Sequence, residues 1–271
     1  MHLVDTHCHL TDRRLAGQLQ AVLNRAGQAG VTAIVSATSS VADSQAAAEL
    51  VAKLGAAEAP SGPRIACTAG VHPHEAKGAE SGYLDSLRRL SRLPGCAGIG
   101  EIGLDYHYDF SPRDVQRRVF AQQLQLALEE AKPVVIHTRE AFADTLAILE
   151  EAKLPPERLL FHSFTGGPAE AAELVRLGCY VSFSGIATFA KAGEIRDSAR
   201  LVPAERILAE TDAPYLSPEP VRRLKTNEPA NVAHVVACLA AARGESAETL
   251  ARQILDNARR FFGEGDMLLL G

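Results

Sequence analysis

The chain of 271 residues has no tryptophan, no long hydrophobic run and no excess of positive charge. No apolar stretch approaches the roughly 20 residues that a membrane-spanning helix needs, so we expect no membrane partner. The net charge of -5 excludes a general electrostatic attraction to nucleic acid. A polyanionic substrate would therefore have to be held by bound cations and local arginines. Polar residues near the start interrupt the apolar region that a signal peptide requires, so none is expected.

A cysteine framework is missing as well. The five cysteines are an odd number, lie far apart and form no C-x-x-C motif. This usage disfavours a disulfide scaffold and predicts a reduced, cytoplasmic protein. Cys8 stands between two histidines, but neighbouring residues of a strand point to opposite faces. We therefore expect Cys8 to pack in the core rather than to bind a metal.

Short apolar runs alternate with longer amphipathic segments along the whole chain. The runs predict strands at 3–9, 31–37, 64–71, 96–101, 134–137, 159–162, 180–184 and 207–210. The amphipathic segments predict helices at 18–29, 41–54, 84–93, 113–130, 142–152, 169–177, 194–201, 230–242 and 247–262. Eight strands alternating with helices predict an α/β protein, a (β/α)8 TIM barrel in a single domain over residues 1–271.

A doubly wound open sheet is the structural alternative. It would not gather residues from strands one, four, five, six and eight into one pocket. A barrel does so, because all its strand ends surround one face.

Histidines and acids recur at the carboxyl ends of these predicted strands. His7 and His9 are two residues apart, so both imidazoles point to the same face of the first strand. Two converging imidazoles are half of a divalent metal site. Taken singly, each residue also has an ordinary explanation as a hydrogen-bonded or turn residue. The candidate ligands are His7, His9, Glu101, His137, His162 and Asp212.

Six ligands are too many for one tetrahedral catalytic site, but they suit two cations that share Glu101. Such a pair can polarise a phosphoryl oxygen, activate water and stabilise the leaving oxygen, which is metal-assisted hydrolysis. The histidines favour Zn²⁺ or Mn²⁺, although phosphodiester hydrolysis often uses Mg²⁺. The expected sets are His7, His9, Glu101 and Asp212 for one cation and Glu101, His137 and His162 for the other.

Four further residues are candidates for substrate binding. His72 and His74 flank Pro73 after the third strand, where they bind a phosphate or water, or only fix the loop. Arg139 is placed to hold a phosphate through two hydrogen bonds, unless it forms a salt bridge with an acidic neighbour. Tyr215 is placed to stack on a base of a single-stranded end, unless it only packs the loop.

Eight segments together resemble the TatD family of metal-dependent deoxyribonucleases. They follow one another in the family's order along essentially the whole chain. They are D-T-H-C-H-L (5–10), G-V-H-P-H (70–74), G-E-I-G-L-D-Y (100–106), K-P-V-V-I-H-T-R (132–139), H-S-F-T-G (162–166), V-S-F-S-G (181–185), E-T-D-A-P-Y-L (210–216) and N-E-P-A-N-V (227–232).

The resemblance implies a (β/α)8 hydrolase that uses divalent metals to cleave DNA, often from an end. It implies Glu101 as the bridging acid and Asp212 as a ligand that takes a proton from the attacking water, so both are expected to be catalytic. It also implies DNA as the partner, in single strands or at frayed ends. No obligate protein partner is expected, and we expect a monomer. Leu224 stands where relatives often have glycine, which puts the contacts of that loop in question.

Two other functions fit the same residues. The same centre could hydrolyse an ester, an amide or a small phosphoester, for example aminoacyl-tRNA, because the two-metal arrangement does not select the leaving group. A non-catalytic metal-binding or scaffold protein is the third alternative. The presence of all six expected ligands argues against that last reading.

Overall fold

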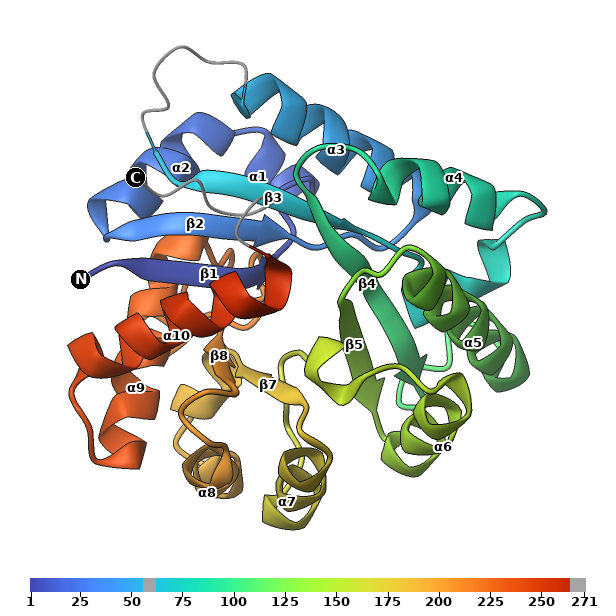
Figure 1. The fold of residues 1–271 in the computed structure, drawn as a ribbon. Coiled ribbons are helices and arrows are strands. Elements are labelled where there is room, and N and C mark those ends of the chain that lie inside the picture. Colours follow the sequence, from blue (N-terminus) through green and yellow to red (C-terminus); the bar gives the residue numbers. More distant parts are fainter. Residues whose placement is uncertain (56–61, 264–271) are drawn as a thin grey trace.

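The computed structural model describes residues 1–55 and 62–263. Within these residues eight parallel strands form one sheet in the order β1 to β8 (Figure 1). The predicted TIM barrel is therefore confirmed. Residues 56–61 and 264–271 of the expected domain lie outside the described residues. The strands are Leu3–Cys8 (β1), Val31–Ser36 (β2), Arg64–Ala69 (β3), Cys96–Asp105 (β4), Val134–Arg139 (β5), Leu159–Phe161 (β6), Tyr180–Phe183 (β7) and Ile207–Ala209 (β8).

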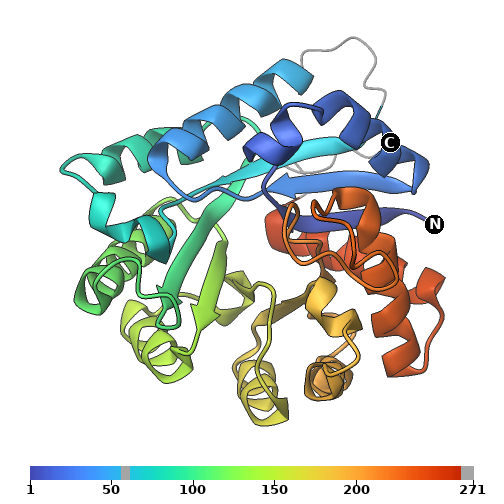
Figure 2. The same ribbon diagram turned by 180° about the vertical axis from the view of Figure 1, so that it is seen from behind.

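Helices alternate with the strands and cover the outside of the sheet, as the view from behind also shows (Figure 2). They bury one face against the strands, as α10 does against β1 and β8. Short 3-10 helices lie at Pro73–Gly78, Pro156–Arg158, Gly185–Thr188 and Pro229–Asn231. The α-helices are Arg13–Ala16 (α1), Leu19–Gln28 (α2), Val41–Gly55 (α3), Tyr83–Ser91 (α4), Arg113–Glu129 (α5), Phe142–Ala152 (α6), Pro168–Leu177 (α7), Gly193–Leu201 (α8), Val232–Arg243 (α9) and Ala247–Phe262 (α10).

Strand β4 is longer than the sequence pattern predicts. The expected end was residue 101, but Ile102 to Asp105 continue to pair with β5, and every residue of the strand is buried. The predicted boundary was wrong because glycines and a carboxylate within the strand resemble a loop. The extra residues place Asp105 inside the barrel, beside the strand end that carries His137.

The barrel closes between β1 and the segment that follows β8. Cys8 and Ala213 form a parallel bridge there. The amide of His9 donates to the carbonyl of Ala213 over 2.7 Å, and the amide of Asp212 donates to the carbonyl of His7 over 2.9 Å. Closure therefore fixes the backbone of both strand-one histidines against the backbone of Asp212.

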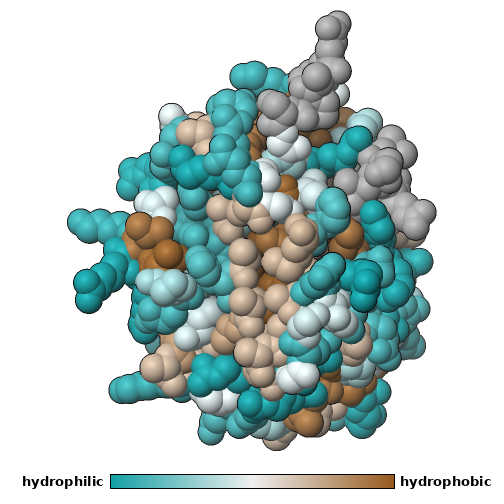
Figure 3. Space-filling model, turned by 90° about the vertical axis from the view of Figure 1, so that its left-hand side faces the viewer, coloured by the Kyte–Doolittle hydropathy of each residue, from teal (hydrophilic) through white to brown (hydrophobic). Residues whose placement is uncertain are grey.

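On the face shown in Figure 3, hydrophilic residues surround a central band of mainly weakly hydrophobic residues. Among residues 1–55 and 62–263, no helix has the length and apolar character needed to cross a membrane. The thiol of Cys8 is fully buried, in agreement with the packing role expected for it.

Replacing Gly103 by alanine tests the close approach of β4 and β5. Gly103 has a φ of +143°, and a Cβ there would overlap the carbonyl oxygen of His137. We expect G103A to lower the free energy of unfolding by about 3 kcal/mol, the upper range for overpacked sites, in a urea titration. The control is G193A, because a Cβ at Gly193 meets nothing within 4 Å. Equal stability of both variants would contradict this account of the strand contact.

Candidate metal centre

The carboxylate of Glu101 lies at the middle of the strand ends and is 3% exposed. Its Oε2 atom faces β1, 3.2 Å from Nε2 of His7 and 3.7 Å from Nε2 of His9. Both imidazoles point toward the same oxygen, as the spacing of two along a strand requires. This side of Glu101 therefore presents one oxygen and two nitrogens to a common point.

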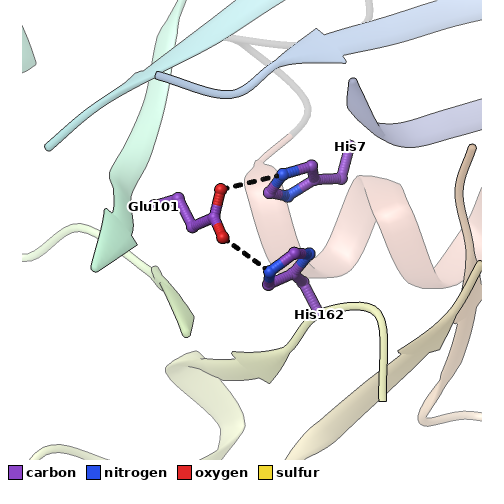
Figure 4. Close-up of side chains that lie close together, drawn as sticks. All are labelled: His7, Glu101 and His162. Carbon is purple, nitrogen blue, oxygen red and sulfur yellow. Dashed lines mark ion pairs between the residues drawn. The ribbon is translucent and has the colours of Figure 1, made fainter. Parts of the chain in front are cut away.

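The other oxygen of Glu101 faces a second group of imidazoles. Its Oε1 atom lies 2.7 Å from Nε2 of His162, 2.9 Å from Nδ1 of His137 and 3.2 Å from Nε2 of His72. Figure 4 shows the two oxygens turned to different partners, His7 and His162. The rings of these two histidines are stacked, with centroids 4.0 Å apart.

Asp212 completes the group on the strand-one side. Its Oδ1 atom lies 3.4 Å from Nε2 of His9 and 3.8 Å from Nε2 of His7. The backbone of Asp212 is left-handed, with a φ of 55°, a conformation that aspartate adopts more readily than most residues. The structure thus brings together all six residues that the sequence suggested as ligands; their ligation of metal stays a prediction.

The chemistry of these side chains fits a cation. Both ring nitrogens of His7 are buried and neither has a hydrogen-bond partner in the described structure. Buried polar atoms of this kind are uncommon, and a metal is one of the groups that accounts for them. Ligand atoms lie within 4.8 Å of one another in three sets: His7, Glu101 and His162; His7, His9 and Asp212; and His72, Glu101 and His137.

Charge also favours a cation at this place. Burial by itself raises the pKa of Glu101, but the nearby His162, His72 and His7 hold that pKa well below its usual value. The acid is therefore ionised at neutral pH. An ionised carboxylate buried among imidazoles needs positive charge nearby, from protons or from metal.

In the metal-free protein this positive charge comes from protonated histidines. Burial lowers the pKa of His162, yet the carboxylates of Glu101 and Glu210 raise it well above 6.5. Burial is outweighed by neighbouring carboxylates in the same way at His137 and His9, whose pKa values are also raised. A metal that binds these nitrogens must displace their protons.

Two acids that were not among the candidates from the sequence accept hydrogen bonds from the ring nitrogens of His137 and His162 that face away from Glu101. His137 donates from Nε2 to the buried carboxylate of Asp105 over 3.0 Å. His162 donates from Nδ1 to Glu210, also buried, over 3.1 Å. Such contacts orient an imidazole toward a metal. Both acids lie within the recognised segments 100–106 and 210–216, so their position beside the ligands was the available signal.

The expected substrate-binding residues differ in where they lie. His72 is 8% exposed and contacts Glu101, and burial lowers its pKa to about 4, so it is a neutral ring of the centre itself. His74 donates from Nε2 to Asp105 over 2.9 Å and thus lies one contact further out. Arg139 is exposed and forms no ion pair with any described residue, so the salt bridge considered for it is absent.

Tyr215 lies at the rim on the strand-one side. Its ring is 47% exposed and meets the ring of His9 edge-on, with centroids 6.0 Å apart. The guanidinium of Arg14 lies over it, 4.2 Å from the ring centre. Leu224 is exposed and is absent from the residues with positive φ, so the loop does not need the backbone freedom of glycine at this position.

Comparisons with known proteins agree with the geometry. The family model described as TatD related DNase matches residues 4–263. The chain is 37% identical to the uncharacterized metal-dependent hydrolase YcfH of Escherichia coli K12, over 97% of this chain and 96% of that protein. It is 39% identical to the 3'-5' ssDNA/RNA exonuclease TatD of Pantoea vagans, over 96% and 99%. The crystal structure of the E. coli TatD homologue YJJV superimposes with a TM-score of 0.88 at 28% identity, covering 96% and 97%.

Metal binding should release protons and become tighter as the pH rises. The raised pKa values of His9, His137 and His162 mean that protons still occupy these rings above pH 6.5. Raising the pH from about 6 to about 8 weakens this competition. Calorimetric titration with Mn²⁺ in two buffers of different ionisation enthalpy measures the protons released. An affinity that does not change with pH, without proton release, would contradict the proposed ligation.

Replacing Asp105 by asparagine should weaken metal binding without removing a ligand. The change weakens the acceptor that holds His137, so we expect a loss of about 10-fold in affinity, the lower end for such supporting contacts. The same Mn²⁺ titration measures it. The matched control is D109N in the loop after β4, where the exposed acid pairs with Arg113. Equal affinities of D105N and D109N would show that Asp105 does not position the ligand.

Proposed function

The chain belongs to the family of TatD-related DNases and is a metal-dependent hydrolase, and on this basis we propose that it removes nucleotides from the ends of single-stranded DNA. The cleaved bond is a phosphodiester. Glu101 would be a ligand of two divalent cations, which would supply activation of the attacking water.

The divided carboxylate of Glu101 is the observation that carries the two-cation proposal. One oxygen faces His7 and His9, and the other faces His137 and His162. A single tetrahedral site would gather its ligands around one point, whereas these nitrogens lie beside two different oxygens of one carboxylate. Histidine nitrogens predominate, which favours Zn²⁺ or Mn²⁺, and Mg²⁺ is the other candidate.

Cations in this centre would supply Lewis acidity to the phosphoryl group and lower the pKa of water. The remaining steps fall to side chains. Burial raises the pKa of Asp212, but the contacts with His9 and His7 lower it further than burial raises it, so the acid is ionised and free to accept a proton. Its side chain is 16% exposed, so it reaches solvent at the edge of the centre. We assign to Asp212 the removal of the proton from the attacking water.

Arg139 supports the choice of a phosphate substrate. It ends β5 two residues after His137 and has no ion pair among the described residues. A guanidinium in that position offers two parallel donors to phosphate oxygens. The Nε2 atom of His74 already donates a hydrogen bond to Asp105, which itself holds His137 rather than Glu101. We therefore assign the phosphate contact to Arg139 and a supporting role to His74.

Cleavage from an end agrees with the charge of the molecule. Binding along a duplex usually takes several phosphate contacts and is driven by positive charge. This chain carries a net charge of -5. A strand end that enters a metal centre needs fewer such contacts. One relative is named a 3'-5' ssDNA/RNA exonuclease, which supports this choice.

End-labelled single-stranded DNA tests the proposal directly. We expect stepwise shortening with Mn²⁺ or Mg²⁺, complete loss of cleavage with EDTA, and a loss of at least about 1000-fold in E101A, since Glu101 would hold both cations. The gel ladder gives the direction of attack. Circular dichroism of E101A serves as the control that the barrel is folded.

Two results would contradict the proposal in different ways. Cleavage that survives in folded E101A would exclude a shared carboxylate. Absence of DNA cleavage with Mg²⁺, Mn²⁺ and Zn²⁺, together with hydrolysis of esters or amides, would assign the same centre to a different bond.

A further inference from the structure

Exposed aromatic rings occur in the described residues only beside the metal centre. Tyr108 is 47% exposed, Phe110 is 55% exposed and Tyr215 is 47% exposed. The first two lie in the loop after β4 and the third in the loop after β8, both at the carboxyl ends of strands. Large aromatic side chains elsewhere in the described barrel are buried or partly buried. Leaving these three rings exposed gives up the free energy that their burial would contribute, and a role in binding explains why they are exposed.

Tyr108 and Phe110 form a stacked pair. Their ring centres are 5.2 Å apart and the planes differ by 17°. His74 meets both rings edge-on, at 5.5 Å from Tyr108 and 4.8 Å from Phe110. The two exposed rings are thus held nearly parallel on a third ring that is itself only 24% exposed.

This pair is tied to the metal centre through Asp105. The amide of Tyr108 donates to Oδ1 of Asp105 over 2.9 Å. The Oδ2 atom of the same acid accepts from His74 and from His137, at 2.9 and 3.0 Å. The fully buried Asp105 therefore fixes the loop that carries the rings and one histidine of the centre in a single arrangement.

The positively charged Arg139 contacts one ring of the aromatic pair. The guanidinium carbon of Arg139 is 4.8 Å from the centre of the Tyr108 ring. Arg139 is exposed and has no carboxylate partner among the described residues. Flat apolar rings beside an unpaired guanidinium match a nucleotide, whose base has π-faces and whose phosphate is an anion.

From these contacts we propose that Tyr108, Phe110 and Arg139 bind one nucleotide of a single strand next to the bond that is cleaved. The inference rests on the proposed function and adds the residues that select its substrate. The base stacks on the aromatic pair, and the adjoining phosphate contacts Arg139. A base inside a duplex has both faces covered by its neighbours, so only an unpaired end can use the pair. The preference for single strands then comes from this loop and not from the metal centre.

The test compares the double variant Y108L/F110L with the wild type on a single-stranded oligonucleotide. Leucine retains hydrophobic bulk but cannot stack on a base. We expect KM to rise about 10-fold, the size of one stacking contact, with kcat unchanged. Y108F retains the ring but lacks the hydroxyl group, so its KM should rise less than that of Y108L/F110L if stacking is what binds the base. L201A removes an exposed hydrophobic side chain on α8 and is the surface control. Titration with Mn²⁺ shows whether the centre of each variant still binds metal.

A set of oligonucleotides, each lacking the base at one of the terminal positions, locates the stacked nucleotide. At that position the missing base should raise KM for the wild type about 10-fold but cause no further rise for Y108L/F110L. Independent effects of the missing base and of the double substitution at every position would overturn the proposal, as would an unchanged KM of the double variant.

Failure of this proposal and of the proposed function can be told apart. If the wild type shortens DNA but Y108L/F110L does so with the same KM, the nuclease assignment stands and the stacking pair is wrong. If the wild type cleaves no DNA, binding of a fluorescein-labelled single strand to E101A decides. If E101A binds the strand and E101A/Y108L/F110L does not, the stacking pair is supported although no DNA is cleaved. If both variants bind equally, or if E101A does not bind, the stacking pair is overturned.

Discussion

The charge of Glu101, buried at the meeting point of the strand ends, is the constraint on which the rest of the site depends. An ionised carboxylate in a protein interior is costly unless positive charge faces it. Here imidazoles from β1, from β5 and from the loops after β3 and β6 surround its two oxygens. Their protons satisfy the charge in the metal-free protein, and cations would satisfy it in the loaded protein. The fold thus places an ionised carboxylate where it requires a neighbouring positive charge.

A layer of buried acids behind the histidines makes this arrangement rigid. Asp105 and Glu210 accept from the outer nitrogens of His137 and His162. Asp5 accepts from the amide and hydroxyl of Thr211 over 2.8 and 2.6 Å, which ties β1 to the segment after β8. Burial raises the pKa of Asp5 to about 8. All three acids are fully buried, so their role is to fix the strand ends that carry the histidines of the centre.

The metal centre and the loops at its rim have different proposed roles. The centre supplies the chemistry, which a phosphodiester, an ester or an amide could use equally. Exposed aromatic rings lie at the rim, and two of them contact an arginine: Tyr108 contacts Arg139 and Tyr215 contacts Arg14. We propose that these loops select the substrate, in keeping with the general position of specificity in barrel enzymes.

The sequence determined the barrel and the six residues at its centre, because strand periodicity shows which side chains share a face and because parallel strand ends meet at one edge. It did not determine the length of β4, whose glycines resemble a loop, and it therefore missed Asp105. Nor did it show that His72 joins the centre, or that Tyr108 and Phe110 form a pair. The contacts of His72 with Glu101 and of Asp105 with His137 join segments far apart in the chain, so only the closure of the barrel sets them. Tyr108 and Phe110 are near neighbours in one loop, and their pairing depends on how His74 and Asp105 hold that loop.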